Sequence, residues 1–195
     1  MATQYKAVVF DLDDTLIDTR GCLVPEALAR VARAAGVPRE RLDAAGKSID
    51  EVLRPAGPLS EAVRAAAAAA WYSPDVPRLA PVPGALDLLQ CLAGITRLFL
   101  LTRGDPVRQQ RKIDRAGLRD RFEAVIVRPI EATGTKRDDL LAILDRCRIQ
   151  PHECLVVGDD EHDEIFHARA LGCDAVRVPA TTWNEVLELV SERST

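Results

Sequence analysis

Acidic residues follow a short apolar run near the start of the chain, in the stretch VVFDLDDTLIDT (residues 8–19). Asp11, Asp13 and Asp14 come directly after residues that favour a buried strand. Aspartate is a poor strand former, and neighbouring carboxylates repel one another. A bound cation would offset this repulsion, so the stretch predicts a metal site at the end of a strand.

Further polar residues occur where other strands are expected to end. In an open parallel sheet, ligands bind outside the carboxyl ends of the strands. The candidate residues at this edge are Asp11, Asp13, Asp14, Thr102, Arg103, Gly104, Asp159, Asp160, Asp163 and Glu164, with Lys136 at the start of a helix. Carboxylates, a hydroxyl and an ammonium at one edge predict a site for a divalent cation together with an anion.

A magnesium ion beside a phosphoryl group fits these residue types. Mg²⁺ takes oxygen ligands, which Asp11 and Asp159 can supply from the tips of neighbouring strands. The phosphoryl group needs hydrogen-bond donors, and Thr102 and Lys136 offer a hydroxyl and an ammonium. The strand-end backbone at residues 103–104 adds N–H groups, and the Arg103 side chain is a further candidate contact.

The first two aspartates can carry out phosphoryl transfer. A carboxylate can attack phosphorus and form an aspartyl-phosphate, and Asp11 is placed for this step. Asp13 lies two residues further, on the same side of an extended chain. It can protonate the leaving oxygen and later deprotonate water.

The strands and helices expected to carry these residues follow a regular order. Apolar runs at residues 6–10, 97–102, 123–127, 154–158 and 174–178 predict strands. Amphipathic stretches at residues 105–116, 136–146 and 163–171 predict helices between the later strands. This alternation predicts an α/β fold with a doubly wound parallel sheet.

The segment 17–82 interrupts the alternation. It contains helix-like stretches at residues 25–35, 39–45 and 60–71, and the Pro-rich stretch 73–84 predicts a semi-rigid linker. We therefore expect an α/β core formed by residues 1–16 and 83–195. Residues 17–82 are expected to form an inserted α-helical domain.

Four motifs in order give the chain a resemblance to a known family. They are DLDDT (residues 11–15), Thr102 within FLLTRG, Lys136, and the acidic VVGDDEHDEI (residues 156–165). The chain resembles the haloacid dehalogenase superfamily of aspartate-nucleophile phosphotransferases. The insertion is similar to the small α-helical cap that many members carry between the first and second motifs.

The resemblance implies a Rossmann-like core, Mg²⁺ dependence and hydrolysis of a phosphomonoester. It implies that Asp11 is the nucleophile and a metal ligand. Asp13 would be the acid and base, with its backbone carbonyl on the metal. Thr102 and Lys136 would hold the phosphoryl group, and Asp159 would ligate the metal. Dehalogenase members lack the second aspartate of this motif, so Asp13 favours phosphate chemistry.

The fourth motif departs from the family pattern. Asp160 stands where a small hydroxyl residue is common, and Glu164 occupies the place usually held by a second aspartate. Asp163 falls one residue early, so either Asp163 or Glu164 could support the metal. Helical register against Gly172, an expected helix cap, favours Glu164.

Composition narrows the class of protein and its partners. The net charge of −4, the pI near 5.5 and an aromatic content of 4% argue against nucleic-acid binding. Five cysteines without a CxxC pattern predict reduced thiols in the cytoplasm. No signal peptide or membrane-spanning run is expected.

The sequence thus predicts a Mg²⁺-dependent phosphatase that hydrolyses a small phosphorylated metabolite, as a monomer or homodimer. A phosphomutase or phosphotransferase of the same superfamily is the nearest alternative. A phosphate- or metal-binding domain without turnover is the alternative from another class.

Overall fold

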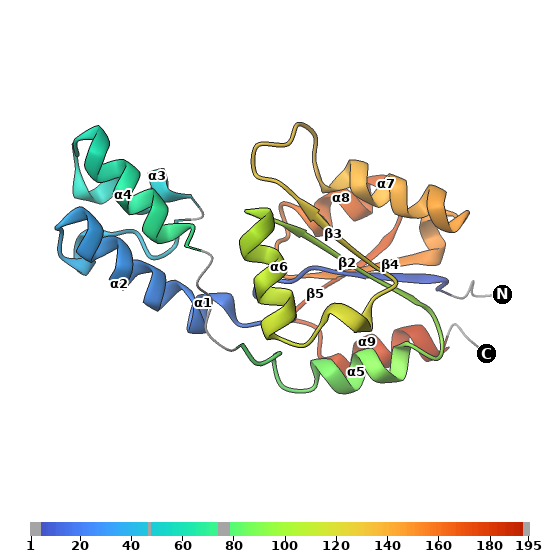
Figure 1. Cartoon of the computed structure of the whole chain (residues 1–195). Helices are drawn as coiled ribbons and strands as arrows, with labels where there is room; N and C mark the ends of the chain where they lie inside the picture. Colours follow the sequence, from blue (N-terminus) through green and yellow to red (C-terminus); the bar gives the residue numbers. More distant parts are fainter. Residues whose placement is uncertain (1–4, 47, 74–78, 193–195) are drawn as a thin grey trace. The chain divides into compact units, whose positions relative to one another are not determined.

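A computed structural model describes residues 5–46, 48–73 and 79–192 of the chain (Figure 1). The chain divides into two compact units. The core unit consists of Met1–Asp18 and Arg78–Thr195, and the inserted unit consists of Thr19–Pro77. The insertion is shorter at both ends than the expected 17–82, because Ile17 bridges to Pro81 within the core unit.

A parallel five-stranded sheet lies at the centre of the described part of the core unit. Its strands are β1 (Ala7–Phe10), β2 (Arg97–Arg103), β3 (Ala124–Arg128), β4 (Cys154–Gly158) and β5 (Asp174–Arg177). They are arranged in the order β3-β2-β1-β4-β5. The predicted α/β class and doubly wound sheet are therefore confirmed.

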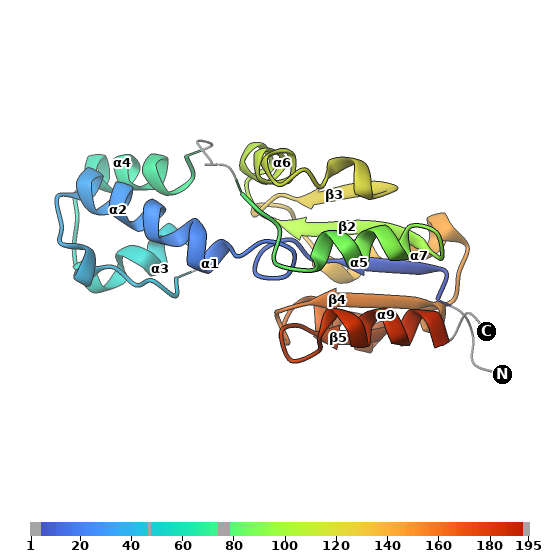
Figure 2. The ribbon, with the colours of Figure 1, turned by 90° about the horizontal axis from the view of Figure 1, so that it is seen from below.

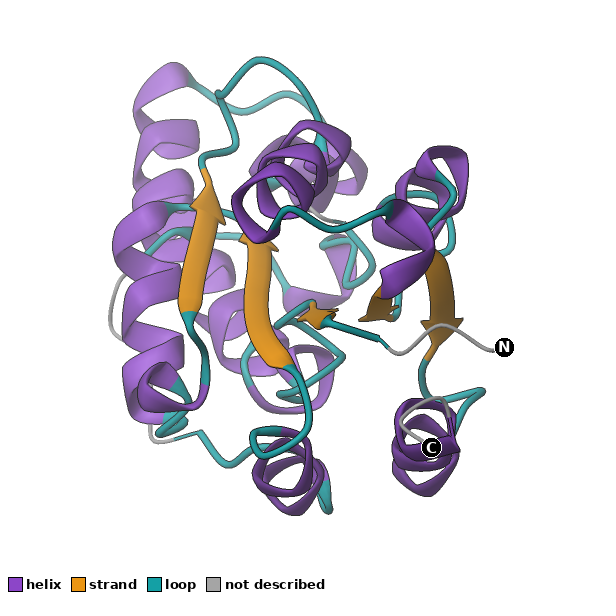
Figure 3. Cartoon of the chain, turned by 90° about the vertical axis from the view of Figure 1, so that its right-hand side faces the viewer, coloured by secondary structure: helices purple, strands orange, loops and turns teal. Residues whose placement is uncertain are grey.

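Helices cover both faces of this sheet. They are α5 (Ala85–Leu92), α6 (Pro106–Arg115), α7 (Lys136–Cys147), α8 (Glu164–Leu171) and α9 (Trp183–Glu192). Figures 1 and 2 show α5 and α9 side by side on one face, with α7 and α8 on the other. Figure 3 shows helices on both sides of the strands, seen from one end. Short 3₁₀ turns occur at Arg119–Arg121 and Pro151–Glu153.

The sheet is apolar on both faces, which explains its continuous hydrophobic runs. Successive side chains of a strand point to opposite faces. Val9 and Phe99 pack with Leu140 and Ile143 of α7 in one buried cluster. Val8 and Phe10 must therefore point to the opposite face, and both are fully buried.

The inserted unit is helical and has its own core. It contains α1 (Thr19–Cys22), α2 (Val24–Ala35), α3 (Ile49–Leu53), α4 (Glu61–Trp71) and 3₁₀ turns at Arg39–Arg41 and Arg54–Ala56. Helices α2 and α4 pack together, and Leu28, Val31, Ala67 and Trp71 are buried between them and their neighbours. Ser60 caps α4 by accepting the Val63 N–H (3.4 Å).

Several sequence expectations about local structure need correction. The helix expected at 39–45 is a single 3₁₀ turn, because the Asp43 carboxylate accepts the Ala45 N–H (2.9 Å) and forms a turn instead. Helices α3, α5 and α9 were not expected. Residues 74–78 of the expected linker lie outside the described residues. Within the described residues, no helix is long and apolar enough to cross a membrane.

Candidate active site

Adjacent strands bring Asp11 and Asp159 to the same edge of the sheet. Strands β1 and β4 are paired, with Phe10 opposite Val157. The Asp11 N–H extends this pairing by donating to the Val157 carbonyl (2.9 Å). Asp159 follows Gly158, the last residue of β4. After β1 the chain continues toward β2, and after β4 it continues toward β5, on the other side of the sheet. Ligands of α/β proteins bind where neighbouring strands diverge in this way.

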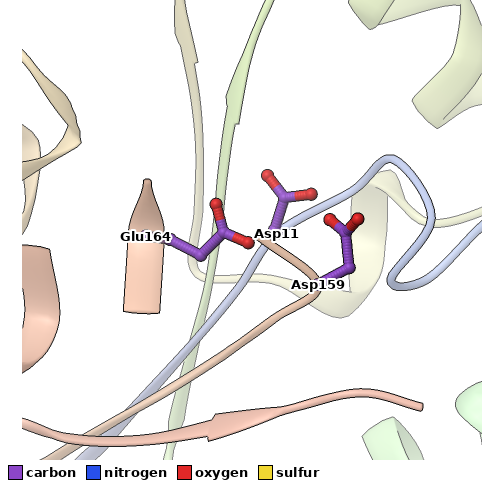
Figure 4. A group of neighbouring side chains, drawn as sticks. All are labelled: Asp11, Asp159 and Glu164. Atoms are coloured by element: carbon purple, nitrogen blue, oxygen red, sulfur yellow. The ribbon is translucent and has the colours of Figure 1, made fainter. Parts of the chain in front are cut away.

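Three carboxylates meet at this edge. Oxygens of Asp11, Asp159 and Glu164 lie within 4.8 Å of one another (Figure 4). Asp11 and Glu164 are buried, and Asp159 is half-buried. A donor set made only of carboxylate oxygens suits a hard cation such as Mg²⁺. The cluster therefore fits the metal that the sequence predicts.

Glu164 reaches this cluster because Gly158 has no side chain. A Cβ atom at position 158 would lie 2.2 Å from the Glu164 Oε1 atom and 2.4 Å from its Cγ atom. The Oε1 atom accepts the Asp160 N–H (2.8 Å), which fixes the carboxylate over the end of β4. Glycine at this position is thus a steric requirement of the site.

Lys136 lies among the acids as the first residue of α7. Its Nζ atom is 2.8 Å from Asp11 Oδ1, 2.7 Å from Glu164 Oε2 and 3.4 Å from Asp163 Oδ2. Burial alone lowers the pKa of the Lys136 ammonium, but the charges of Asp11 and Glu164 raise that pKa overall. Lys136 is therefore a permanent cation in the site.

The backbone before α7 is held by polar contacts. Thr135 caps the helix, and its own N–H donates to the Asp138 carboxylate (2.8 Å). Arg128, at the end of β3, pairs with Asp139 and donates to the Thr133 carbonyl (2.7 Å). These contacts connect the β3–α7 loop to the strand and to the helix. They therefore fix the first turn of α7 and the position of Lys136 within it.

Burial dominates the electrostatics of Asp11. Burial, together with the negative charges of Glu164 and Asp13, raises the pKa of the Asp11 carboxyl from 3.8 to about 8. The opposing charge of Lys136 lowers this pKa but does not outweigh the burial. A cation at the cluster would stabilise the ionised form of Asp11.

Asp163 and Glu164 differ clearly in their surroundings. The Glu164 side chain is 3% exposed and belongs to the carboxylate cluster, whereas the Asp163 side chain is 32% exposed. Asp163 Oδ1 lies 3.8 Å from His167 Nε2, one turn further along α8. The structure thus brings Glu164 into the cluster and leaves Asp163 at its margin.

Asp13 and Thr102 meet two residues that the sequence interpretation did not identify. Gln109 Nε2 contacts both Asp13 Oδ2 (2.8 Å) and Thr102 Oγ1 (2.7 Å). Lys112 Nζ contacts Asp13 Oδ1 (2.7 Å). Their spacing places both on one helix face, because residues three apart lie near one another, but spacing does not tell whether that face points toward the sheet. On α6 that face also carries the buried Ile113.

Arg103 and Gly104 make contacts away from the carboxylate cluster. The Arg103 guanidinium donates to the Ile130 carbonyl (3.0 Å), in the loop after β3. The Gly104 N–H donates to the Arg128 carbonyl (3.0 Å) and so extends the β2–β3 pairing. The structure thus does not bring Arg103 or Gly104 into direct contact with Asp11, Asp159 or Glu164.

The fold is a doubly wound parallel sheet, with an aspartate directly after its first strand and a carboxylate cluster at its carboxyl edge. The sequence model of the haloacid dehalogenase-like hydrolases matches residues 5–172. The chain belongs to this family, which confirms the resemblance inferred from its motifs.

Similar proteins are phosphatases and other members of this family. Glyceraldehyde 3-phosphate phosphatases from Pyrococcus abyssi and Pyrococcus furiosus are each 28% identical over 88% of this chain, and the matches cover 80% and 79% of those proteins. A subfamily IA hydrolase structure from Geobacter sulfurreducens has a TM-score of 0.69 at 22% identity, covering 95% of this chain and 96% of that one.

An L-2-haloacid dehalogenase structure from Xanthobacter autotrophicus has a TM-score of 0.60 at 24% identity, covering 95% of this chain and 82% of that one. At this identity the similarity shows the shared fold. The family match and the curated relatives together identify the chain as a phosphoric monoester hydrolase of the haloacid dehalogenase-like family.

Proposed function

We propose that this protein is a Mg²⁺-dependent phosphatase that hydrolyses a small phosphorylated metabolite through an aspartyl-phosphate on Asp11. One observation carries the proposal: a buried lysine contacts the aspartate that belongs to a three-carboxylate cluster. The cluster can hold a cation, and the ammonium can hold a phosphate. The nucleophile lies between them.

Each residue has a chemical task in this proposal. Asp11 and Asp159 would ligate the metal, with the Asp13 carbonyl as a further ligand. Glu164 would support the metal, because both of its carboxylate oxygens already accept hydrogen bonds. When bound, Mg²⁺ would offset the negative charge of the phosphoryl group and of the acids.

In the first half-reaction, an Asp11 carboxylate oxygen attacks phosphorus and the bond from phosphorus to the leaving oxygen breaks. The leaving oxygen takes a proton from Asp13. Lys136 and Thr102 donate hydrogen bonds to phosphoryl oxygens. The products are the aspartyl-phosphate and the free alcohol.

In the second half-reaction, Asp13 removes a proton from water and the water oxygen attacks phosphorus. The bond from phosphorus to the Asp11 oxygen breaks, which restores the carboxylate and releases inorganic phosphate. Asp13 is protonated again and ready for the next cycle.

The curated relatives suggest which substrates to test first. Both are called glyceraldehyde 3-phosphate phosphatase. We therefore propose a small phosphorylated metabolite as substrate and glyceraldehyde 3-phosphate as the first candidate. The inserted unit, initially expected at residues 17–82, is proposed to act as a cap that sets specificity and excludes water.

Five free cysteines support a reducing compartment, and we propose a cytoplasmic location for the enzyme. We propose that it acts as a monomer or homodimer and needs no nucleic-acid or membrane partner.

Release of inorganic phosphate from p-nitrophenyl phosphate tests the proposal. We expect turnover with Mg²⁺, loss of turnover with EDTA, and recovery when Mg²⁺ is restored. A phosphomutase or phosphotransferase would instead pass phosphate to an acceptor, so glycerol is included as an acceptor and both products are quantified. Equal activity with Mg²⁺ and with EDTA would contradict the metal requirement. No release from this compound or from glyceraldehyde 3-phosphate would favour a binding domain.

The three acids of the fourth motif should differ in their effect on metal use. Asp159→Asn should raise the Mg²⁺ concentration for half-maximal activity by more than about 100-fold, because it removes a charged ligand. Glu164→Gln should raise it about tenfold, as is typical of a supporting residue. Asp163→Asn is the matched control and should change it less than about threefold.

Metal titrations of activity on the three variants check this order. The amide substitutions keep the side-chain volume, so the packing of Glu164 against Gly158 is preserved. A larger effect of Asp163→Asn than of Glu164→Gln would make Asp163 the supporting acid.

A further inference from the structure

Helix α6 buries two polar side chains, Gln109 and Lys112, which we call the α6 pair. Their residues are 2% and 5% exposed. Burying an amide and an ammonium is unfavourable unless each is hydrogen-bonded. Replacing a whole buried ion pair by well-packed apolar residues is often neutral or stabilising, so a buried ion pair is weak evidence for a purely structural role. The contacts of the α6 pair therefore indicate a role beyond packing.

The α6 pair holds the carboxylate of Asp13 from two directions. Lys112 Nζ lies 2.7 Å from Oδ1, and Gln109 Nε2 lies 2.8 Å from Oδ2. Because each oxygen accepts from a different residue, the contacts restrict both the position and the rotation of the carboxylate plane.

The same amide nitrogen connects Asp13 to Thr102. Gln109 Nε2 lies 2.7 Å from Thr102 Oγ1 and 3.3 Å from the Arg103 carbonyl. A carboxylate and a carbonyl only accept hydrogen bonds, so this atom must be the NH₂ nitrogen. The Thr102 hydroxyl therefore accepts from Gln109, and its own hydrogen points to a different acceptor.

Gly104 makes room for this arrangement. A Cβ atom at position 104 would lie 2.9 Å from the Cγ and Cδ atoms of Gln109. The glutamine is thus packed against the strand-end backbone.

From this geometry we propose that the α6 pair positions Asp13 and Thr102 for phosphoryl transfer. It keeps the Asp13 carboxyl directed toward the leaving oxygen and keeps the Thr102 hydroxyl as a donor to the phosphoryl group. This inference rests on the proposed function, in which Asp13 transfers a proton to the leaving group. Gln109 and Lys112 act through these two residues and are therefore positioning residues.

Leaving-group dependence distinguishes positioning from a general structural role. Phenolate is more basic than p-nitrophenolate and needs a proton more as it leaves. Lys112→Met and Gln109→Leu should lower kcat/KM for phenyl phosphate about 10- to 100-fold. Their losses on p-nitrophenyl phosphate should be several-fold smaller. Asp13→Asn, measured in parallel, should show the same pattern more strongly.

Neighbouring residues on α6 provide matched controls. Gln110→Leu and Arg111→Met make the same kinds of change outside the α6 pair and should leave both kcat/KM values within about twofold. Lys112→Arg keeps a cationic donor and should recover part of the loss on phenyl phosphate. The double variant Asp13→Asn/Lys112→Met should lose no more on phenyl phosphate than Asp13→Asn alone, because both act through one proton transfer.

The outcomes separate this inference from the function on which it rests. If Asp13→Asn shows the leaving-group pattern but the α6 variants lose equally on both substrates, or gain activity, the positioning role is wrong while the proposed function stands. If Asp13→Asn itself shows no such pattern, the acid role of Asp13 fails. Should Lys112→Met not fold, Lys112→Arg and the charge-balanced double variant decide the question.

Discussion

Asp11→Asn is expected to leave a folded protein with turnover lowered by about four orders of magnitude or more. A neutral amide cannot attack phosphorus and is a poor ligand for Mg²⁺. The measurement is phosphate release at saturating Mg²⁺. Asp18→Asn makes the same chemical change at an exposed position of the same loop, and it should keep full activity. Asp11→Asn activity within tenfold of the wild type would exclude Asp11 as the nucleophile.

The same variant has a stability readout that is independent of activity. Burial raises the pKa of Asp11 from 3.8 to about 8, so the folded wild type holds a proton that the unfolded chain releases between these values. Without metal, wild-type stability should therefore fall as the pH rises through this window. The amide of asparagine at position 11 does not ionise, so the variant lacks this pH dependence. Thermal unfolding in EDTA should show Asp11→Asn gaining stability relative to the wild type between pH 5 and pH 8.

Lys136→Met is expected to lower turnover by about three orders of magnitude and to destabilise the metal-free protein. The substitution removes the ammonium that contacts Asp11 and Glu164 in a buried site. Breaking a buried ion pair from one side costs about 3–5 kcal/mol in the free energy of unfolding. The loss should be smaller at pH 5 than at pH 8, because Asp11 can then take a proton. Added Mg²⁺ should restore part of the stability.

Lys6→Met is the control for this experiment. Lys6 also pairs with a glutamate, Glu153, at 2.6 Å, but its side chain is 53% exposed. Because the Lys6 side chain is half exposed, its loss should destabilise the protein less than the loss of Lys136, and activity should not change. Denaturant unfolding and phosphate release are measured on both variants. Equal destabilisation of the two variants, or full activity of Lys136→Met, would contradict the assigned role of Lys136.

Much of the fold could be predicted because strands buried on both faces have a local signature. The runs that form β1, β2 and β4 are largely apolar and these strands are buried, as a covered parallel sheet requires. The site acids could be predicted for a related reason. Residues that follow parallel strands share one edge, so Asp11 and Asp159 converge whatever the details of packing.

Other elements have weaker local signals. Helices α5 and α9 carry none of the four motifs, and no helix was predicted at either position. The helix expected at 39–45 does not form beyond one 3₁₀ turn. The Asp43 carboxylate accepts a hydrogen bond from the Ala45 N–H, which favours a turn over a helix.

The order of the apolar runs, the acids that follow them and the lysine that begins α7 can all be found in the sequence. Asp163 and Glu164 are alternatives at that level, and the folded chain places Glu164 over the backbone of Gly158, which has no side chain. The α6 pair also required the folded chain. Which face of a polar helix points inward depends on its docking against the sheet, a long-range contact that local spacing cannot specify.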